Sequence, residues 1–170
     1  KKTNLYSINH YAESLIKHCD TKNEKEKTTR GGINTVKQVW ENRAITTNGF
    51  FPTDGSGLSR SNGVSSYQLA SILTSMYNSK NYNSFNSSLP IAGKTGTLKY
   101  VLKNTTAQGN IRAKTGSIER VRAYSGYVDC STGETLAFSI VLNDYSCSSA
   151  EAIKKLVGIM KLLPGIKIKK

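Results

Sequence analysis

The chain has 170 residues, of which 37% are hydrophobic, 21% are charged and only three are proline. A chain of this size and composition can bury a hydrophobic core, which excludes an intrinsically disordered protein and favours one domain or a large part of one. The 24 Lys and Arg outnumber the 11 Asp and Glu, and the resulting charge of +13 favours an anionic partner such as nucleic acid, acidic lipid or a carboxylate-bearing polymer.

Several classes are disfavoured by the residue pattern. The lysines are scattered without an aromatic platform between them, so the sequence does not predict nucleic-acid binding, and a solvated basic surface explains them. Cys19, Cys130 and Cys147 lack CxxC spacing, and His10 and His18 are too far apart for a one-turn pair, so we expect no metal site. The odd cysteine count leaves the redox compartment open. No segment is apolar over the ~18 residues that a membrane span needs.

Two helices are predicted near the start of the chain. The first covers residues 8–19, with Ser7 as its N-terminal cap and an apolar face formed by Ile8, Ala12, Leu15, Ile16 and Cys19. The charged residues 20–30 predict a surface loop. Residues 34–43 predict a second, short helix that buries Val36, Val39 and Trp40.

A long connection and a third helix follow. Residues 47–63 are dense in Gly, Ser, Asn and Asp, which predicts an irregular segment of a length that is often functional. Residues 65–80 then repeat the helical pattern after a serine-rich cap, through Leu69, Ile72, Leu73 and Met76.

The hydrophobic period changes after residue 110. Three short segments rich in β-branched and aromatic residues follow, at residues 111–116, 120–129 and 135–144. Turn-forming stretches separate them, which predicts an antiparallel meander. Residues 149–163 return to a helical pattern that stops at Pro164 and Gly165. Helices, a meander and a final amphipathic helix predict an α+β fold with that helix packed on the sheet.

The triplet Lys-Thr-Gly occurs twice, and the first copy matches part of a phosphate-binding loop. Gly93, Lys94 and Thr95 fit the last three positions of that motif. Ser88 stands where the first glycine belongs, Pro90 lies inside the loop and no apolar strand precedes it. Because a phosphate cradle needs a strand, a flexible loop and a helix N-terminus together, nucleotide binding is disfavoured.

The second triplet, Lys114-Thr115-Gly116, is expected at the end of a predicted strand, where its side chains are held on a rigid edge. An ammonium beside a hydroxyl can bind a substrate carboxylate, and the next backbone N–H can face a developing oxyanion. Taken alone, the triplet favours the alternative that Lys114 is a strand-end lysine in solvent.

The context of the second triplet resembles a known family. The segments "YSINHYAESLIKH", "DGSGLSRSN", "LPIAGKTGTLKY" and "AKTGSIERVRAYSGYV" occur in this order over residues 6–128. Together they resemble the D-alanyl-D-alanine carboxypeptidase/endopeptidase family, the class C low-molecular-mass penicillin-binding proteins, whose relatives share Ser-x-x-Lys, Ser-Asp-Asn and Lys-Thr-Gly motifs. The resemblance implies a penicillin-recognising transpeptidase/β-lactamase-like fold, of which the chain holds a part.

The resemblance also implies roles for individual residues. Ser7 and Asn9 match the Ser-x-Asn motif, with Ile8 an unusual middle residue, and Lys114 matches the catalytic lysine of the third motif. Ser7 is expected to relay a proton to the leaving amine, Asn9 to bind the peptide carbonyl and Lys114 to supply positive potential. The substrate-binding residues implied are Thr115, Gly116 and Ser117. We expect the hydroxyl of Ser7 and the ammonium of Lys114 to line opposite walls of one pocket, with Lys94 outside it.

The nucleophile is not found in this sequence. Ser14 and Lys17 form a literal Ser-x-x-Lys match, but they share a predicted helix with Ser7 and face another side of it, whereas the family's motif lies far upstream. The chain is therefore expected to be the C-terminal portion of a longer enzyme, inactive alone, with the N-terminal part of the same protein as a partner. Asp54, Ser56 and Arg60 are expected to have structural roles at the cleft wall.

The activity implied is acyl transfer without a cofactor. The substrate is a peptidoglycan peptide ending in D-Ala-D-Ala, penicillins and other β-lactams are inhibitors, and the location is the periplasm or extracytoplasmic cell envelope. Two alternatives stay open: a serine β-lactamase-like hydrolase, and a basic module that binds cell wall or nucleic acid without catalysis.

Overall fold

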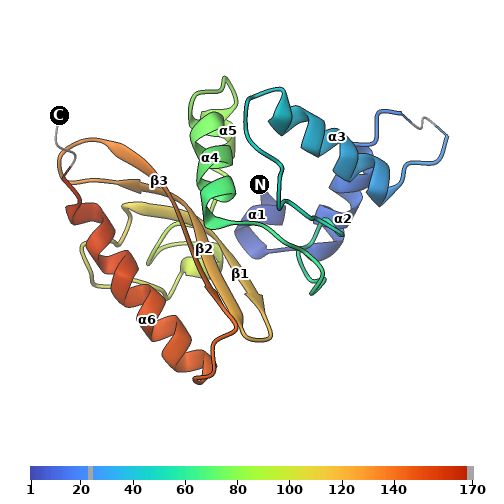
Figure 1. Cartoon of the computed structure of the whole chain (residues 1–170). Coiled ribbons are helices and arrows are strands. Elements are labelled where there is room, and N and C mark those ends of the chain that lie inside the picture. Colours follow the sequence, from blue (N-terminus) through green and yellow to red (C-terminus); the bar gives the residue numbers. More distant parts are fainter. Residues whose placement is uncertain (23–24, 168–170) are drawn as a thin grey trace.

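The computed structural model describes residues 1–22 and 25–167, and this part of the chain forms an α+β arrangement, as predicted (Figure 1). In chain order the helices and strands are α1 (Lys2–Tyr6), α2 (Asn9–His18), α3 (Thr29–Glu41), α4 (Ser66–Tyr77), α5 (Tyr82–Asn86), β1 (Ile111–Ile118), β2 (Val121–Asp129), β3 (Thr135–Asn143) and α6 (Ser149–Leu162). Short 3₁₀ turns, η1 (Gly96–Leu98) and η2 (Leu163–Gly165), precede the sheet and follow α6.

The strands form the predicted antiparallel meander, in the order β1-β2-β3 within the described residues. Lys114 pairs with Ser125, which pairs with Ser139, so these three residues point to the same face of the sheet. The helices cover opposite faces, with α6 on one side and α4 on the other (Figure 1). The predicted packing of the last helix on the sheet is confirmed.

The main hydrophobic core lies between α6 and the sheet. Leu156 and Met160 of α6 are buried against residues at alternating strand positions, which include Ala113, Tyr124 and Phe138. The segment that leads into β1 contributes further buried side chains to the same core, namely Ala92, Leu98, Leu102 and Ala107. This core anchors the first half of β1, the strand that carries the second triplet, through Ile111 and Ala113.

A second, smaller core joins α4 and α5 to the opposite face of the sheet. Tyr127 of β2 is 2% exposed and packs with Leu73 of α4 and Leu89. Its hydroxyl donates a hydrogen bond of 2.7 Å to the carbonyl of Leu73, and its ring contacts those of Tyr82 and Phe85 edge to face. Burial raises the pKa of Tyr127, so this hydroxyl keeps its proton and its bond to α4 at neutral pH.

The junction of α2 and α3 is organised around the buried carboxylate of Asp20. It accepts hydrogen bonds from the backbone N–H and the hydroxyl of Thr28, both 3.1 Å long, and from the N–H of Lys22. The Thr28 hydroxyl in turn accepts the N–H of Gly31 and caps α3. A carboxylate at this helix start also lies favourably in the helix dipole.

Several sequence expectations need correction. Ser7 does not cap α2; it is the C-terminal cap of the short helix α1, which the sequence pattern did not predict because it has only five residues. Helix α3 begins at Thr29 rather than 34, so part of the predicted loop 20–30 is helical and residues 23–24 of that loop lie outside the described residues. Val39 and Leu15, expected to be buried, are exposed.

Cys19, Cys130 and Cys147 are all free thiols in the structure. Among the described residues, no helix combines the length and the apolar character that crossing a bilayer requires.

Candidate active site

The side chains of Ser7 and Lys114 meet directly, although 107 positions separate them in the chain. The ammonium Nζ of Lys114 lies 2.8 Å from the hydroxyl Oγ of Ser7 and 2.6 Å from the carbonyl oxygen of Thr115. Ser7 reaches this position from the turn between α1 and α2, where it adopts a left-handed conformation with φ of 55°. The two groups were expected to face each other from opposite walls of one pocket, and they are in fact in direct hydrogen-bond contact.

Lys114 lies near the middle of β1, not at the end of a strand as the sequence suggested. Its side chain is half-buried, and burial lowers the pKa of its ammonium, because both hydrogen-bond acceptors are uncharged oxygens that only partly replace water. A lysine with a lowered pKa releases a proton more readily than one in solvent. The alternative of a solvent-exposed, strand-end lysine is therefore wrong.

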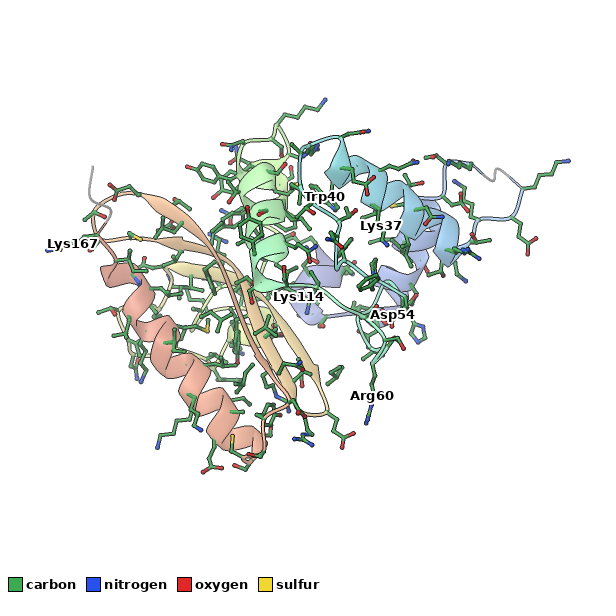
Figure 2. All side chains as sticks on the ribbon, in the orientation of Figure 1. Lys37, Trp40, Asp54, Arg60, Lys114 and Lys167 are labelled. Atoms are coloured by element: carbon green, nitrogen blue, oxygen red, sulfur yellow. The ribbon has the colours of Figure 1, made fainter. Side chains whose placement is uncertain are left out.

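Ser7 and Lys114 line a cavity of about 440 Å³ together with Asn9 and Thr115. Asn9 is the first residue of α2, and the hydroxyl of Thr115 lies 3.1 Å from that of Thr97. The remainder of the lining is mixed: polar residues such as Asn4, Asp54 and Asn62 lie beside apolar ones, which include Ala12, Phe50, Pro52, Val64 and Leu69. In Figure 2 the labelled Lys114 lies where the sheet meets the helices that precede it in the chain.

Gly116 and Ser117 continue β1 beyond the residues that line this cavity. Both are exposed, and Ser117 pairs with Arg122 of β2. The structure therefore brings Ser7, Asn9, Lys114 and Thr115 together, whereas Gly116 and Ser117 lie farther along the same strand edge.

The segment "DGSGLSRSN" forms one wall of the cavity and is held by its own side chains. The carboxylate of Asp54 accepts the N–H groups of Gly57 and Ser59, both at 2.6 Å, and the side-chain amide of Asn62 at 3.0 Å. Burial alone raises the pKa of Asp54, but these hydrogen bonds outweigh it and lower the pKa, so the carboxylate stays ionised. This is a structural role for Asp54, as expected.

Glu13 fastens this wall to α2. Its carboxylate accepts the backbone N–H groups of Gly55 and Ser56 at 3.2 and 2.9 Å, and the hydrogen bond from the Ser56 side chain is the main reason that the pKa of Glu13 is lowered. Glycine is required at position 55, because a Cβ there would lie 2.5 Å from the carbonyl oxygen of Ala12. Glu13 follows Asn9 by four residues, so both side chains lie on one side of the helix.

Arg60 and Glu119 connect the same wall to the other side of the cavity. Their side chains form an ion pair between the loop and the β1–β2 turn, and both are largely exposed. Figure 2 shows Arg60 extending away from the labelled Asp54, on the side of the loop that faces the hairpin.

The first Lys-Thr-Gly triplet has a structural function outside the cavity. The hydroxyl of Thr95 accepts the N–H of Ile91, and Gly96, with φ of 56°, lies so close to the carbonyl of Leu5 that any Cβ would collide with it. Lys94 is exposed. This turn supports α1 and hence the position of Ser7, which explains the duplicate.

The literal Ser-x-x-Lys match on α2 does not form a site. Ser14 and Lys17 are both exposed, and the hydroxyl of Ser14 donates to the carbonyl of His10 within its own helix. A nucleophile paired with a base is thus not formed by these two residues.

Residues 1–162 match the model of one protein family, described as the D-Ala-D-Ala carboxypeptidase 3 (S13) family. The chain belongs to this family. Its curated relatives include the D-alanyl-D-alanine carboxypeptidase of Actinomadura, 33% identical over 91% of this chain and 29% of that protein. They also include the penicillin-sensitive carboxypeptidase A of Dictyostelium discoideum, 30% identical over 95% of this chain and 32% of that protein. The chain spans about a third of the length of these relatives.

Solved structures confirm the penicillin-recognising fold. Penicillin-binding protein 4 from Haemophilus influenzae superposes with a TM-score of 0.87 and 26% identity over 97% of this chain and 39% of that one, and a second structure of it contains a novel β-lactam. The TLA-3 extended-spectrum β-lactamase superposes with a TM-score of 0.68 over 96% of this chain and 61% of that one, at 18% identity, which shows a shared fold alone.

Sequence reasoning matched Glu13 to the acid that follows the family's second motif, but it did not predict the bonds by which Glu13 holds the loop, nor Thr97 as a neighbour of the site. Thr97 follows the duplicated triplet, and no local pattern relates it to Thr115, 18 residues away.

Proposed function

We propose that this chain is the C-terminal portion of a serine-type D-Ala-D-Ala carboxypeptidase or endopeptidase that acts on peptidoglycan peptides through an acyl-enzyme and is inhibited by penicillins. The observation that carries the proposal is the contact between Ser7 and Lys114 inside a cavity that Asn9 and Thr115 also line. Membership of the S13 family and the names of the relatives support the same reaction.

The Ser7–Lys114 contact suits protonation of the leaving amine. The Ser7 oxygen accepts a hydrogen bond from Lys114, so its own proton is free to point into the cavity. When the C–N bond of the peptide breaks, Ser7 gives its proton to the departing nitrogen and takes another from Lys114. Burial lowers the pKa of Lys114, which favours this transfer. The relay returns Ser7 to its starting state and leaves Lys114 to recover a proton from solvent.

The same groups suit recognition of a carboxylate. Lys114 provides positive potential in a half-buried place, and the hydroxyls of Thr115 and Ser117 lie along one strand edge to hydrogen-bond the terminal carboxylate of D-Ala-D-Ala. Gly116 allows the ligand to approach the strand, and the N–H of Ser117 is suited to the oxyanion. Asn9 orients the peptide carbonyl and the lysine of the missing nucleophile motif.

The nucleophile comes from an upstream segment of the same protein. A second cavity, of about 360 Å³, adjoins the first and shares Ala12, Phe50 and Pro52 with it. Its other apolar lining residues come from α2 and α3 and include Leu15, Ile16, Ile33 and Val36. This second cavity is an apolar slot beside the one that Ser7 and Lys114 line, and it suits a helix whose first turn carries the serine and lysine of a Ser-x-x-Lys motif.

This reaction places the protein in the cell envelope, where its substrate is found, and uses side-chain and backbone groups without a cofactor. Labelling of the full-length protein with a fluorescent penicillin tests it. We expect a durable covalent label, and a loss of labelling rate of about 100-fold or more in Lys114→Gln, since proton transfer of this kind contributes on the order of 10²–10⁴. Lys94→Gln is the matched control, in the duplicate triplet, and should label normally.

Three results would contradict the proposal. Rapid release of the label indicates a β-lactamase, and absence of labelling indicates a binding module without this chemistry. Equal rates in the Lys114→Gln and Lys94→Gln proteins would show that the Ser7–Lys114 contact does not take part.

A further inference from the structure

The turn η1 contacts both sides of the candidate site, namely α1, which ends at Ser7, and β1. Gly96 lies against the carbonyl of Leu5 in α1. The next residue, Thr97, contacts the side chain of Thr115 in β1. The first Lys-Thr-Gly triplet and the threonine that follows it thus reach the second triplet, through a contact that the proposed reaction does not use.

The backbone of η1 is firmly held. Leu98 is fully buried in the main core, and its carbonyl accepts the N–H groups of Gly93 and Val101, both at 3.0 Å. Thr97 precedes Leu98 directly, so it presents its hydroxyl from a fixed position. Its branched Cβ further restricts where this hydroxyl can lie.

Thr115 is held at two points. Its carbonyl accepts the ammonium of Lys114 at 2.6 Å, and its hydroxyl donates to the hydroxyl oxygen of Thr97 at 3.1 Å. Hydrogen bonds between hydroxyl groups are commonly about 2.7–2.8 Å long, so the bond to Thr97 is a weak one. The proton of Thr115 can therefore turn to a stronger acceptor in the cavity, and a carboxylate is such an acceptor.

Thr97 can compensate for the bond that it loses in this exchange. A hydroxyl both donates and accepts, and among the described residues the Thr97 hydroxyl has no partner besides Thr115. When Thr115 gives its hydrogen bond to a carboxylate, Thr97 can donate its own proton to the Thr115 oxygen. The two bonds then run in one direction, from Thr97 through Thr115 to the carboxylate, and each polarises the next.

We propose that Thr97 is a positioning residue for carboxylate recognition, which fixes the Thr115 hydroxyl at the cavity and strengthens its hydrogen bond to a ligand with a free carboxylate. The inference rests on the proposed function, in which Thr115 binds that carboxylate. Among the described residues, Thr115 lines the cavity and Thr97 does not. Thr97 therefore acts through Thr115, and its role does not require that Thr97 be accessible in the full-length protein.

Acylation of the full-length protein by benzylpenicillin and by its methyl ester tests the inference, because only the first compound has a free carboxylate. Intact-protein mass spectrometry gives both rates on one preparation, so the fraction of folded protein cancels in their ratio. Thr97→Val keeps the shape of the side chain and removes the hydroxyl. We expect the preference for the free acid to fall about fivefold, as for loss of one hydrogen bond, through weaker binding with an unchanged limiting rate.

Two further variants separate this role from a structural one. Thr97→Ser keeps the hydroxyl and should restore the preference of the unchanged protein. Thr106 is an exposed threonine in the same segment before β1, where its hydroxyl reaches the carbonyl of Lys161. Thr106→Val is therefore the matched control and should leave both rates unchanged.

An unchanged preference in Thr97→Val, or equal slowing with the acid and the ester, would overturn the inference. A Thr97→Ser protein that behaves like Thr97→Val would overturn it too, because the hydroxyl would then not be the group that matters. If the unchanged protein forms no acyl-enzyme with either compound, the proposed function itself fails, and this result differs from each of the others.

Discussion

At the scale of single residues, the site depends on carboxylates that carry out no chemistry themselves. Glu13 and Asp54 each accept hydrogen bonds from backbone N–H groups of one loop. The pKa values of both are lowered, mainly by side-chain hydrogen bonds from Ser56 to Glu13 and from Asn62 to Asp54, and further by the backbone N–H groups. The bonds of Glu13 thereby attach the loop that forms one wall of the cavity to α2, the helix that begins with Asn9. Displacement of this wall by a fraction of an ångström would alter the space available to a substrate beside Ser7.

We expect Glu13→Gln to destabilise the protein and flatten part of its pH dependence. The folded pKa of Glu13 lies below its ordinary value of 4.5, so its carboxylate contributes stability above that pH and loses the contribution as the pH falls through the folded value. Urea unfolding between pH 3 and 7 measures the effect. The exposed Glu26→Gln is the control, and an identical pH profile for both variants would show that Glu13 has no anchoring role.

At the scale of elements, α4 is attached to the sheet by a specific polar contact as well as by packing. The Tyr127 hydroxyl bonds to the carbonyl of Leu73, within a cluster of aromatic rings. This carbonyl belongs to the interior of α4, so the bond fixes the helix along its axis, and with it Leu69, which lines the cavity.

Tyr127→Phe should lower the free energy of unfolding by about 1 kcal/mol, because the hydroxyl is lost and the buried carbonyl of Leu73 loses a donor. Chemical denaturation measures the change. Tyr100, which is 78% exposed, offers the same substitution as a control and should give no change. Equal stability of both variants would mean that the bond to α4 contributes nothing.

The elements also show what the sequence can and cannot predict. Helix α4, the meander and α6 were predicted because each has a strong hydrophobic period. The serine-rich cap expected before α4 is confirmed at Ser65, whereas the cap of α6, Ser148, was not predicted. Helices α1 and α5 have five residues each, too few to show a period. The start of α3 was missed because it depends on Asp20, eight residues before Thr28, a contact without a local pattern.

The same limit applies to the site. Short motifs specify residue types and spacing, and they were sufficient to select four residues of the site: Ser7, Asn9, Lys114 and Thr115. The hydrogen bond between Ser7 and Lys114 depends on how α1 and β1 pack, and the contact of Thr97 with Thr115 depends on the turn at η1. Such contacts arise only when distant segments fold together.

At the scale of the whole molecule, the chain holds two of the three motifs on which the proposed reaction depends. The cavity and the adjoining apolar slot are formed by residues of this chain, and Ser7 and Lys114 are already in contact within it. The receiving half of the site thus forms without the segment that we expect to supply the nucleophile.

We therefore expect the 170-residue chain alone to resist penicillin labelling, and co-expression with the upstream part of the protein to restore labelling on that upstream part. Gel fluorescence of the two separated polypeptides identifies the labelled one. Phe50→Asp, which places a charge in the lining that the cavity and the apolar slot share, should prevent restoration, whereas Phe51→Asp, at an exposed neighbour, should not. A label on this chain would show that it contains its own nucleophile.

The left-handed turn at position 7 restricts which residue can occupy it. Of the two aliphatic hydroxyl amino acids, serine tolerates this backbone shape at modest cost, while the branched Cβ of threonine crowds it. Ser7→Thr therefore keeps the functional group yet should lower stability by about 1 kcal/mol or more and move the oxygen away from Lys114. Steric selection and acid–base chemistry thus choose the same amino acid, so exchange of one alcohol for the other is no conservative change here.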